Sequence, residues 1–515
     1  MKTVLMSVTD KTGLVEFAKQ LCEIFPDITI IASGGTAKTL GTIPYKQVYE
    51  VTQFPECFGG RVKTLHPKIM GGVLYRRGLD DAEAEKLDIP QIDMVVCNLY
   101  NFAEASKKEN SIESLIEHMD IGGSTLIRSA IKNHASVAIV VDPADYGMIL
   151  ENLCHGGLSL ETRRKLAVKA INVSADYEAV IAEELSRRLG DEETRRPRLT
   201  AGRKLRYGEN PDQEGWVYRF PEQKGIANAE ILAGKELSYN NYEDATAAFH
   251  AVDAIRKLGS HGVAIIKHGN LCGYATGKIQ EETFEDAWDG DTKSAFGSII
   301  AFTHPVSESL VPHLKGKFVE VLVAPDFTTD FVEWAKRAKP NLRLLKVSHI
   351  TEQKWLYKNI SGGMLVQSSK SSRENAHQVV TRKHPASEQM PLFDFAIASV
   401  QFAKSNAISI VREKKPGCYQ LIGMGSGQPN RVDSLQRLAV PKALENLERE
   451  GSNLSNCVLA SDGFFPFDDS VRCAAQYGIT TCIQPGGSNN DAAVIETANE
   501  LNMCMIFTGE RYFTH

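Results

Sequence analysis

The first part of the chain alternates two patterns of apolar residues. Thr3–Val8 and Ile28–Ala32 are short apolar runs that predict buried strands. Between them, Gly13–Phe25 spaces its apolar residues three or four positions apart, which puts them on one face of a helix. A second helix begins at Ala37–Leu40, and further strand-like runs follow at Met94–Leu99 and Val137–Val141. Strands that alternate with helices predict a parallel sheet with helices on both faces.

The pattern becomes helical and charged from about 146 to 200. The run SRRLGDEETRRPR, Ser186–Arg198, has almost no apolar content and is typical of a solvated connector. We therefore expect an N-terminal domain at 1–145, a helical connector at 146–199 and a second domain at 200–515.

The second domain is again mixed α/β. Its length exceeds one ordinary core, so two subdomains are expected. Several of its strands end in polar or glycine-rich turns, where open α/β sheets usually bind ligands. The predicted strands are Val263–Ile266, Ser298–Phe302, Val319–Val323, Val458–Ala460, Ile479–Ile483 and Met503–Phe507.

Composition narrows the possible partners. The formal net charge of −6 argues against a general nucleic-acid or membrane-surface binder, although a local basic cluster could still bind a small anion. The ten cysteines form no C-x-x-C pair, so neither a disulfide framework nor a zinc ribbon is expected. The chain starts without a signal-like apolar segment and has no apolar run long enough to cross a membrane, so we expect a cytoplasmic location.

Two N-terminal segments are candidates for anion binding. The turn Ser33-Gly34-Gly35-Thr36 follows a strand and opens a helix, so its N–H groups could hold a phosphate. It does not match the dinucleotide or NTP fingerprints, and a plain strand-to-helix turn is the alternative. The loop Gly59–Gly72 gathers four basic side chains between glycines, which suits an anion, although such loops are often just solvated.

Polar groups at other strand ends suggest condensation chemistry. Tyr100 closely follows the Met94–Leu99 strand, and Asp120 precedes a helix that contains Arg128 and Lys132. A phenol, a carboxylate and lysines could polarise an amide condensation. Sequence spacing alone does not show that they converge.

In the second domain, the segment Ile265–Gly273 is the most distinctive. A strand delivers Lys267 and His268 into a turn rich in Gly and Asn, which exposes a base beside a cation. A structural role for this histidine stays open. Two segments dense in donors and aromatics, 206–211 and 237–241, could bind a sugar phosphate or a heterocycle, and the phenylalanines of 461–469 could flank a flat ring.

Taken in order, these segments resemble the bifunctional AICAR transformylase/IMP cyclohydrolase family from end to end. The N-terminal motifs are SVTDKTG, ASGGTAKTL, GGRVKTLHPK, NLYNF and DIGGSTLIRSAIKNH. The C-terminal ones are LRYGENPDQ, LSYNN, KHGNLCG, SAFGSIIAF, SNAI, GSGQ, SDGFFPF, QPGGS and TGERYFTH. Each motif is weak alone, but this many in the family's order are very specific.

The resemblance implies that the second domain transfers the formyl group of 10-formyltetrahydrofolate to the 5-amino group of AICAR. By similarity, His268 takes the amine proton and Lys267 stabilises developing negative charge. A further catalytic position is Asn406. The residues implied to bind nucleotide or folate are Arg206, Tyr207, Asn240, Phe464, Asp469 and His515, the last as the end of a docked segment.

The resemblance also implies that the first domain converts formyl-AICAR to IMP: the carboxamide nitrogen attacks the formyl carbon and water leaves. The residues implied for this step are Lys63, Tyr100, Asp120 and Lys132. Those implied to position the substrate and its phosphate are Ser33, Gly34, Gly35, Thr36, Arg61 and Thr64.

The implied architecture is a methylglyoxal-synthase-like (Rossmann-like) parallel-sheet domain followed by two cytidine-deaminase-like subdomains. The missing H-x-E…P-C-x-x-C signature agrees with a family that lacks catalytic zinc. The family is dimeric, with transferase sites between subunits, and no catalytic metal is expected; a structural monovalent cation is left open.

Five positions depart from the family's usual wording. Leu271, Ser124 and Asn101 stand where proline is usual, Asp212 where histidine is usual, and Ser298 where glycine is common. Leu271 removes a restriction on Asn270 beside the Lys–His pair. Asp212 adds a negative charge near the expected nucleotide site. Because all the proposed catalytic side chains are present, we expect altered kinetics rather than loss.

Two other functions stay open. The chain could be a cyclohydrolase whose transferase half has become a scaffold, or a nucleotide-binding sensor with neither activity. A metal-dependent deaminase is least favoured because no ligand spacing supports it.

Overall fold

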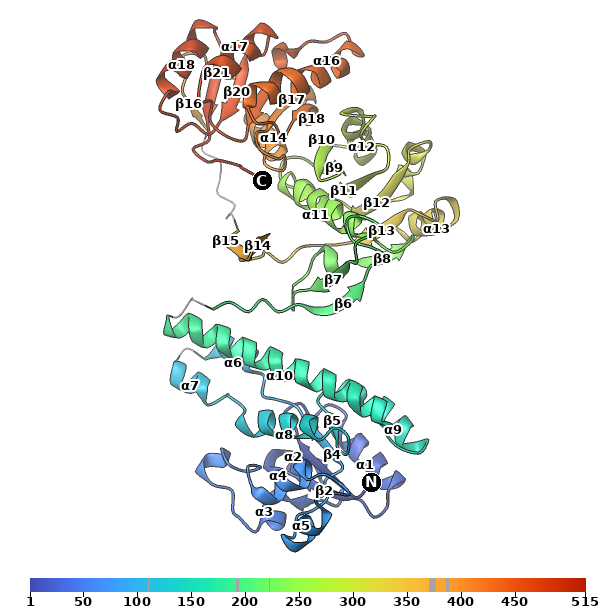
Figure 1. The fold of residues 1–515 in the computed structure, drawn as a ribbon. Coiled ribbons are helices and arrows are strands. Elements are labelled where there is room, and N and C mark those ends of the chain that lie inside the picture. The colour runs from blue at the N-terminus through green and yellow to red at the C-terminus, as the bar shows by residue number, and fades with distance from the viewer. Residues whose placement is uncertain (110, 191–193, 222, 370–376, 386–388) are drawn as a thin grey trace. The chain divides into compact units, whose positions relative to one another are not determined.

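The computed structural model describes residues 1–515 except 110, 191–193, 222, 370–376 and 386–388. The chain forms two compact units, Met1–Arg198 and Leu199–His515 (Figure 1). Each unit has its own sheet and its own hydrophobic cores.

The first unit is built on a five-stranded parallel sheet in the order β3-β2-β1-β4-β5. The strands are β1 (Thr3–Ser7), β2 (Thr29–Ala32), β3 (Lys46–Gln47), β4 (Met94–Cys97) and β5 (Ala138–Val140). The parallel sheet and four of its strands are confirmed where the apolar runs predicted them.

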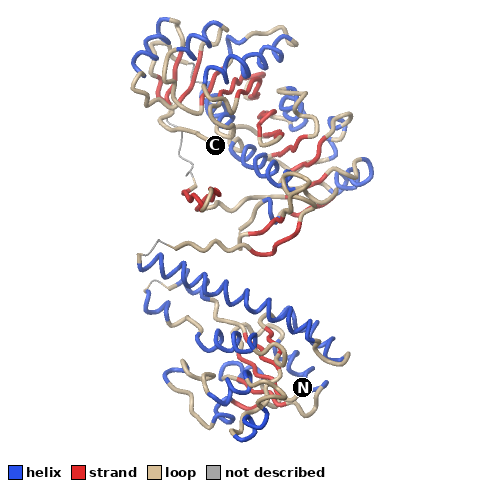
Figure 2. Tube along the Cα trace, viewed as in Figure 1, coloured by secondary structure: helices blue, strands red, loops and turns tan. Residues whose placement is uncertain are grey.

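Helices cover both faces of this sheet, and Figure 2 shows the strands in red among the blue helices. One core contains Val4, Met6 and residues of α1, and the other contains Leu5, Ile31 and residues of α8. The helices are α1 (Leu14–Ile24), α2 (Gly34–Leu40), α3 (Val48–Thr52), α4 (Pro67–Leu74), α5 (Asp81–Lys86), α6 (Phe102–Lys108), α7 (Ile112–Ile116), α8 (Ile121–Lys132), α9 (Tyr146–Cys154) and α10 (Leu160–Leu189).

The segment expected to be a connector belongs to the first unit. Leu166, Ala167 and Ala170 of α10 are buried in the cores of this unit, so no compact unit ends at 145. The solvated connector was predicted to begin at Ser186, which is wrong because α10 continues to Leu189. Its Arg188 donates to the carboxylate of Glu184 and to two main-chain carbonyls, which keeps the charged helix end folded.

The second unit is built on a 12-stranded sheet made of two topologically matching halves. The first half, green to yellow in Figure 1, has the order β8-β13-β12-β11-β9-β10, and the second, orange to red, has the order β16-β21-β20-β19-β17-β18. The strands of the first half are β8 (Glu230–Ala233), β9 (His261–Lys267), β10 (Asn270–Gly277), β11 (Ser298–Phe302), β12 (Val319–Ala324) and β13 (Arg343–Lys346). Those of the second are β16 (Gln378–Val379), β17 (Ile408–Lys415), β18 (Cys418–Gly425), β19 (Val458–Ser461), β20 (Thr481–Gln484) and β21 (Cys504–Phe507).

Each half has an antiparallel hairpin, three parallel strands and an antiparallel edge strand. The halves join through β10 and β18, which pair antiparallel with Ala275 opposite Gln420. The two hairpin turns therefore lie at opposite ends of the central strand pair. The six strands predicted in this domain are all confirmed, with ends shifted by a few residues.

One face of the sheet has a core that spans both halves. It contains side chains of α11 (Tyr239–Ala254), α14 (Met390–Val400) and strands of each half, and Tyr274 of β10 stacks on Phe395 of α14 at 5.1 Å between ring centroids. The other face carries separate cores under the helices of each half. These helices are α12 (Gln280–Asp289) and α13 (Thr329–Ala338), then α15 (Arg431–Asp433), α16 (Val440–Glu448), α17 (Asp469–Gln476) and α18 (Asp491–Glu500).

Two small hairpins complete the unit: β6 (Thr200–Lys204) with β7 (Trp216–Arg219), and β14 (Trp355–Ile360) with β15 (Gly363–Ser368). Among the described residues of the whole chain, no helix is long and apolar enough to cross a membrane.

Candidate active sites

The Lys–His pair lies at the tip of the first hairpin. Lys267 at the end of β9 pairs with Asn270 at the start of β10, so His268 and Gly269 form the loop. Both residues have positive φ, 50° and 71°, as the tight turns of twisted hairpins require. The His268 side chain is therefore presented at the sheet edge, where it is exposed.

Lys267 is held against the loop that precedes β11. Its ammonium group donates to the carbonyls of Phe296 and Gly297, at 2.9 and 2.8 Å. These bonds use two of the three N–H groups of the ammonium.

Asn406 lies near the same edge, at the start of β17. Its amide group donates to the carbonyls of Gln428 and Pro429 at 3.1 and 3.0 Å, in the loop that follows β18. In the same loop, the Ser426 hydroxyl donates to the Asn270 side chain at 3.1 Å. The loop after β18 thus connects Asn406 to the Lys–His turn.

A buried ion pair that the sequence did not indicate fixes Asn406. Arg431 donates to Asn406 Oδ1 at 2.9 Å and to the Asp462 carboxylate at 2.8 Å, and Asp462 is fully buried. Arg431 also donates to the carbonyl of Phe464 at 3.1 Å, which brings the predicted phenylalanine motif to this cluster. A weak signal existed, because Asp462 lies inside the recognised SDGFFPF motif.

The C-terminal segment reaches the same cluster. The Ser405 N–H, next to Asn406, donates to the carbonyl of Thr514 at 2.9 Å. The Lys358 ammonium donates to the carbonyl oxygen of His515 at 3.1 Å, and the His515 ring is 5.7 Å from that of Phe513. His515 therefore ends a docked segment rather than a frayed one.

Other predicted binding residues of this unit form a second group. Asn240, exposed at the start of α11, donates to the carbonyl of Glu209 at 3.4 Å, and Arg206 lies over the Tyr207 ring at 5.5 Å. The neighbouring Asn241 is buried and completes the capping box of α11, so Asn240 is the more exposed of the two. Asp469 is exposed at the start of α17, bonded to the Ser470 N–H.

In the first unit, Asp120 caps α8 and is partly buried. Its carboxylate accepts the N–H of Gly123 at 2.6 Å. Burial raises the pKa of Asp120, while the N–H groups of Gly123 and Tyr100 and the charge of Lys63 oppose this rise. The structure thus brings Asp120, the Tyr100 main chain and Lys63 together.

Lys63 is also 3.7 Å from the carboxylate of Glu56, a residue that sequence reasoning missed. The other Glu56 oxygen is 3.7 Å from the place a Cβ on Gly34 would occupy, so Glu56 lies between Lys63 and the Ser33–Thr36 turn. Thr64 is buried beside Gly122 of α8, and Arg61 is exposed and paired with Glu117.

The Ser33–Thr36 turn is tied to the end of β1. The Ser33 hydroxyl is 3.0 Å from that of Ser7, and the Thr36 hydroxyl accepts the N–H of Val8 at 2.9 Å. A Cβ at Gly35 would meet no side chain and no distant backbone atom within 4 Å, so nothing packs against this side of the turn.

Lys132 stands apart from the other predicted cyclohydrolase residues. It is exposed at the C-terminal end of α8 (Ile121–Lys132), about 18 Å along the helix axis from Asp120 at about 1.5 Å per residue. A groove of about 720 Å³ between α8 and α10 has Asp120 and Lys132 in its wall, together with Tyr177 and Ile181. The groove is continuous, but Lys132 is not part of the cluster at Asp120.

The structure explains some of the residues that differ from the family's usual motifs. Asn101 caps α6 by accepting the N–H of Glu104 at 3.1 Å, and Leu271 is buried in the shared core beside a bulge of β10. Asp212 is exposed. Ser124 and Ser298 both have buried hydroxyls without a hydrogen-bond partner, and nothing in the structure explains them.

No group of three or more His, Cys, Asp or Glu side chains in the described ranges is arranged to hold a metal ion. What the structure does provide is two separate polar clusters, each at a sheet edge. One has a base beside a cation, and the other has a carboxylate beside a lysine. This combination defines a two-site α/β enzyme for transfer and condensation chemistry.

Comparison with known proteins gives the family. The AICARFT/IMPCHase bienzyme family model matches residues 130–442, and the MGS-like domain model matches residues 13–125. The "Bifunctional purine biosynthesis protein PurH" of Persephonella marina is 44% identical over 100% of both chains, and that of Aquifex aeolicus is 42% identical over 99% of both. A solved structure titled "Crystal structure of ForH" is 30% identical over 36% of this chain and 98% of its own, with a TM-score of 0.32.

The chain belongs to the AICARFT/IMPCHase bienzyme family. It is therefore a bifunctional enzyme of purine biosynthesis, with AICAR formyltransferase and IMP cyclohydrolase activities, and formyltetrahydrofolate is the co-substrate of the transferase. Its N-terminal domain is MGS-like, as predicted.

Proposed function

We propose that Leu199–His515 transfers the formyl group of 10-formyltetrahydrofolate to the 5-amino group of AICAR, and that Met1–Arg198 closes the ring of formyl-AICAR to give IMP. The observation that carries this assignment is the linkage of the Lys267–His268 turn to Asn406 through the loop after β18. A base, a cation and an amide are then available around one reacting amine.

In the transfer step, the amine nitrogen of AICAR attacks the formyl carbon. His268 accepts the proton that the nitrogen loses, and Lys267 stabilises the negative charge that develops on the formyl oxygen. The C–N bond to the folate then breaks, and tetrahydrofolate leaves with a proton on its nitrogen. Asn406, held by Arg431, orients the substrate for this attack.

The two groups of binding residues divide the substrates between them. Arg206 and Tyr207, with the nearby Asn240, supply a cation, a phenol and an amide for the nucleotide. Phe464, Asp469 and His515 flank the folate. Arg206 and Asn240 are exposed, which suits a site that a second subunit completes.

In the cyclisation step, the carboxamide nitrogen attacks the formyl carbon and the formyl oxygen leaves as water. Asp120 and Lys63 carry the protons that the two nitrogens lose to the departing oxygen, and Tyr100 donates a hydrogen bond to this oxygen. Ser33, Gly34, Gly35, Thr36, Arg61 and Thr64 position the substrate and its phosphate. Lys132 is assigned here by family resemblance alone, so its substitution by alanine is the sharpest separate test of the assignment.

The assembly we propose is a cytoplasmic homodimer that acts on AICAR, formyl-AICAR and folate, with transferase sites between subunits and no nucleic-acid or membrane partner. Catalysis needs no metal, and a monovalent cation has at most a structural role. The repeated topology of the 12-stranded sheet supports two subdomains, which we assign as cytidine-deaminase-like.

The decisive experiment follows tetrahydrofolate release and IMP formation together, with purified protein, AICAR and 10-formyltetrahydrofolate. Both products are expected in step. If added formyl-AICAR is cyclised while AICAR is not formylated, the proposed roles of Lys267 and His268 are wrong. If AICAR binds but neither reaction occurs, the chain is a nucleotide-binding sensor.

A further inference from the structure

One carboxylate holds both N–H groups of the catalytic turn. Asp244, in the second turn of α11, accepts the N–H of His268 at 3.1 Å and the N–H of Gly269 at 2.6 Å, one on each oxygen. The His268 carbonyl is bonded as well, by the Asn270 side chain at 2.9 Å. The main chain of the turn is therefore tied to α11 below it and to β10 beside it.

The conformation of His268 needs this support. Its φ of 50° lies in the left-handed region, which costs a non-glycine residue free energy and persists only where its surroundings enforce it. Hydrogen bonds to an ionised carboxylate are stronger than those between neutral groups. Two of them on consecutive N–H groups favour the conformation that presents the imidazole at the sheet edge.

We propose that Asp244 is a positioning residue of the transferase: it holds the His268 turn so that the imidazole meets the AICAR amine. This inference rests on the proposed role of His268. Asp244 touches no reacting atom, and it acts through the main chain of the turn.

The helix that carries Asp244 also carries a proposed nucleotide-binding residue. Asn240 lies four positions earlier on α11, and residues four apart share one face of a helix. Through Asn240 and Asp244, a single rigid helix fixes the distance between the nucleotide and the base.

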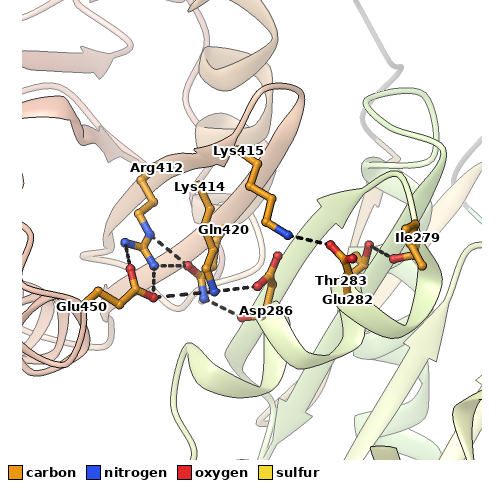
Figure 3. Close-up of polar contacts among 9 residues, drawn as sticks. All are labelled: Ile279, Glu282, Thr283, Asp286, Arg412, Lys414, Lys415, Gln420 and Glu450. Atoms are coloured by element: carbon orange, nitrogen blue, oxygen red, sulfur yellow. Dashed lines mark hydrogen bonds and ion pairs between the residues drawn. The ribbon is translucent and has the colours of Figure 1, made fainter.

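The equivalent turn of the second half provides a matched control. There the loop is Pro416-Gly417, and the Gly417 N–H donates at 2.7 Å to Glu413 of β17, the strand before the loop. Glu413 thus supplies the same kind of bond, from a carboxylate to a loop N–H, at the turn that has no proposed base. Figure 3 shows the neighbouring Lys415 engaged in an ion pair instead.

The test compares Asp244→Ala, Asp244→Asn and Glu413→Ala in the full-length protein. For Asp244→Ala we expect kcat for formyl transfer to fall about 10- to 100-fold, because a displacement of about 1 Å has effects of this size. The KM values for AICAR and folate should stay near those of the wild type. Asp244→Asn keeps one acceptor oxygen, so its kcat should lie between those of Asp244→Ala and the wild type. Glu413→Ala should transfer at the wild-type rate, and all variants should cyclise formyl-AICAR normally.

Two readouts separate positioning from a general structural effect. In a His268→Ala background, Asp244→Ala should cause no further loss, because the side chain it positions is already gone. The pH–rate profile of Asp244→Asn should keep its midpoints and lose only amplitude. A shifted midpoint would mean that the charge of Asp244 acts on the imidazole directly and would overturn the inference.

Other results would also overturn it: wild-type transfer by both Asp244 variants, a raised KM for AICAR with unchanged kcat, or an equal loss in Glu413→Ala. If Asp244→Ala does not fold, Asp244→Asn decides alone by its kcat and its pH profile. Wild-type transfer by His268→Ala would instead refute the proposed catalytic role of the turn, and the inference with it.

Discussion

The hairpins β9–β10 and β17–β18 occupy matching places in the two halves of the 12-stranded sheet, but only the first turn has a histidine, and the lysines of the two turns have different partners. The first reads Lys267-His268-Gly269-Asn270, and the second Lys415-Pro416-Gly417-Cys418. Lys267 donates to two main-chain carbonyls at the sheet edge, whereas Lys415 pairs with Glu282 of α12 at 2.7 Å.

The second hairpin belongs instead to an ionic cluster, here called the bridge, in which Lys414 and Lys415 pair with α12 of the first half and Arg412 pairs within the second half (Figure 3). Arg412, which is buried, binds Glu450 through two nitrogens and also donates to Gln420. Lys414 binds Asp286 of α12 at 2.7 Å. Equal positions in a repeated fold therefore do not imply equal functions, because function follows the side chains placed there.

The largest expected effect comes from removing the base. His268→Ala should lower kcat for formyl transfer by about 10²- to 10⁴-fold, the usual contribution of a general base. Cyclisation of formyl-AICAR should be unchanged because we assign it to the other unit. Pro416→Ala, at the matching position, should transfer normally; comparable losses in both variants would mean that both turns serve catalysis.

A smaller loss should follow from crowding Lys267. A Cβ on Gly297 would lie 2.9 Å from the Lys267 ammonium, and the φ of 70° at Gly297 disfavours alanine. Gly297→Ala should therefore move Lys267 and lower kcat for transfer about 100-fold, as misplacements of about 1 Å can. Gly417→Ala has a similar φ of 76° but lies in the second turn, so its steady-state transfer rate should match the wild type.

The bridge should matter for stability and not for rate. Arg412→Met removes the donor to Gln420 and leaves Glu450 only its contact with Lys414 at 3.6 Å. It should lower the free energy of unfolding by about 2 kcal/mol, as lost hydrogen bonds to charged groups do. Urea unfolding measures the free energy of unfolding of each variant, and a transferase assay of the folded protein measures kcat. Lys415→Met breaks only an exposed pair and should cost less than about 1 kcal/mol. A lower kcat in Arg412→Met would contradict the division between the two hairpins.

The smallest effect is on pH dependence. Hydrogen bonds from Arg412 hold the pKa of Glu450 below its ordinary value of 4.5. The unfolded chain then binds more protons in this range, so the contribution of the pair is present above pH 4.5 and is lost as the pH falls through the lower native pKa. The stability difference between wild type and Arg412→Met should shrink in acid; a difference independent of pH would show that the pair does not depend on the charge of Glu450.

The strands that could be predicted were continuous apolar runs buried on both faces. β17 was missed because its apolar start, Ile408–Val411, gives way to the charged residues Arg412–Lys415 that form the bridge. The edge strands β3 and β16 were missed because each has only two residues. The repeat itself was invisible in sequence because the halves share strand order and not residues.

The candidate site was predictable only where its residues are adjacent in the chain. Lys267 and His268 are neighbours, so their pattern indicated a base beside a cation. Asp244 and Ser426 are far from the turn in the sequence, and only the packing of α11 and the pairing of β10 with β18 bring them to it. Long-range packing of this kind leaves no periodicity in the sequence.

The core that spans both halves has a consequence for the transferase unit. Tyr274 of one half stacks on Phe395 of the other, inside an apolar cluster that neither half could enclose alone. A gene fragment encoding either half would therefore yield a product with an exposed apolar face, prone to aggregate. The second half therefore serves the first in two ways, because it covers the apolar face of the first half and supplies Asn406 to the site.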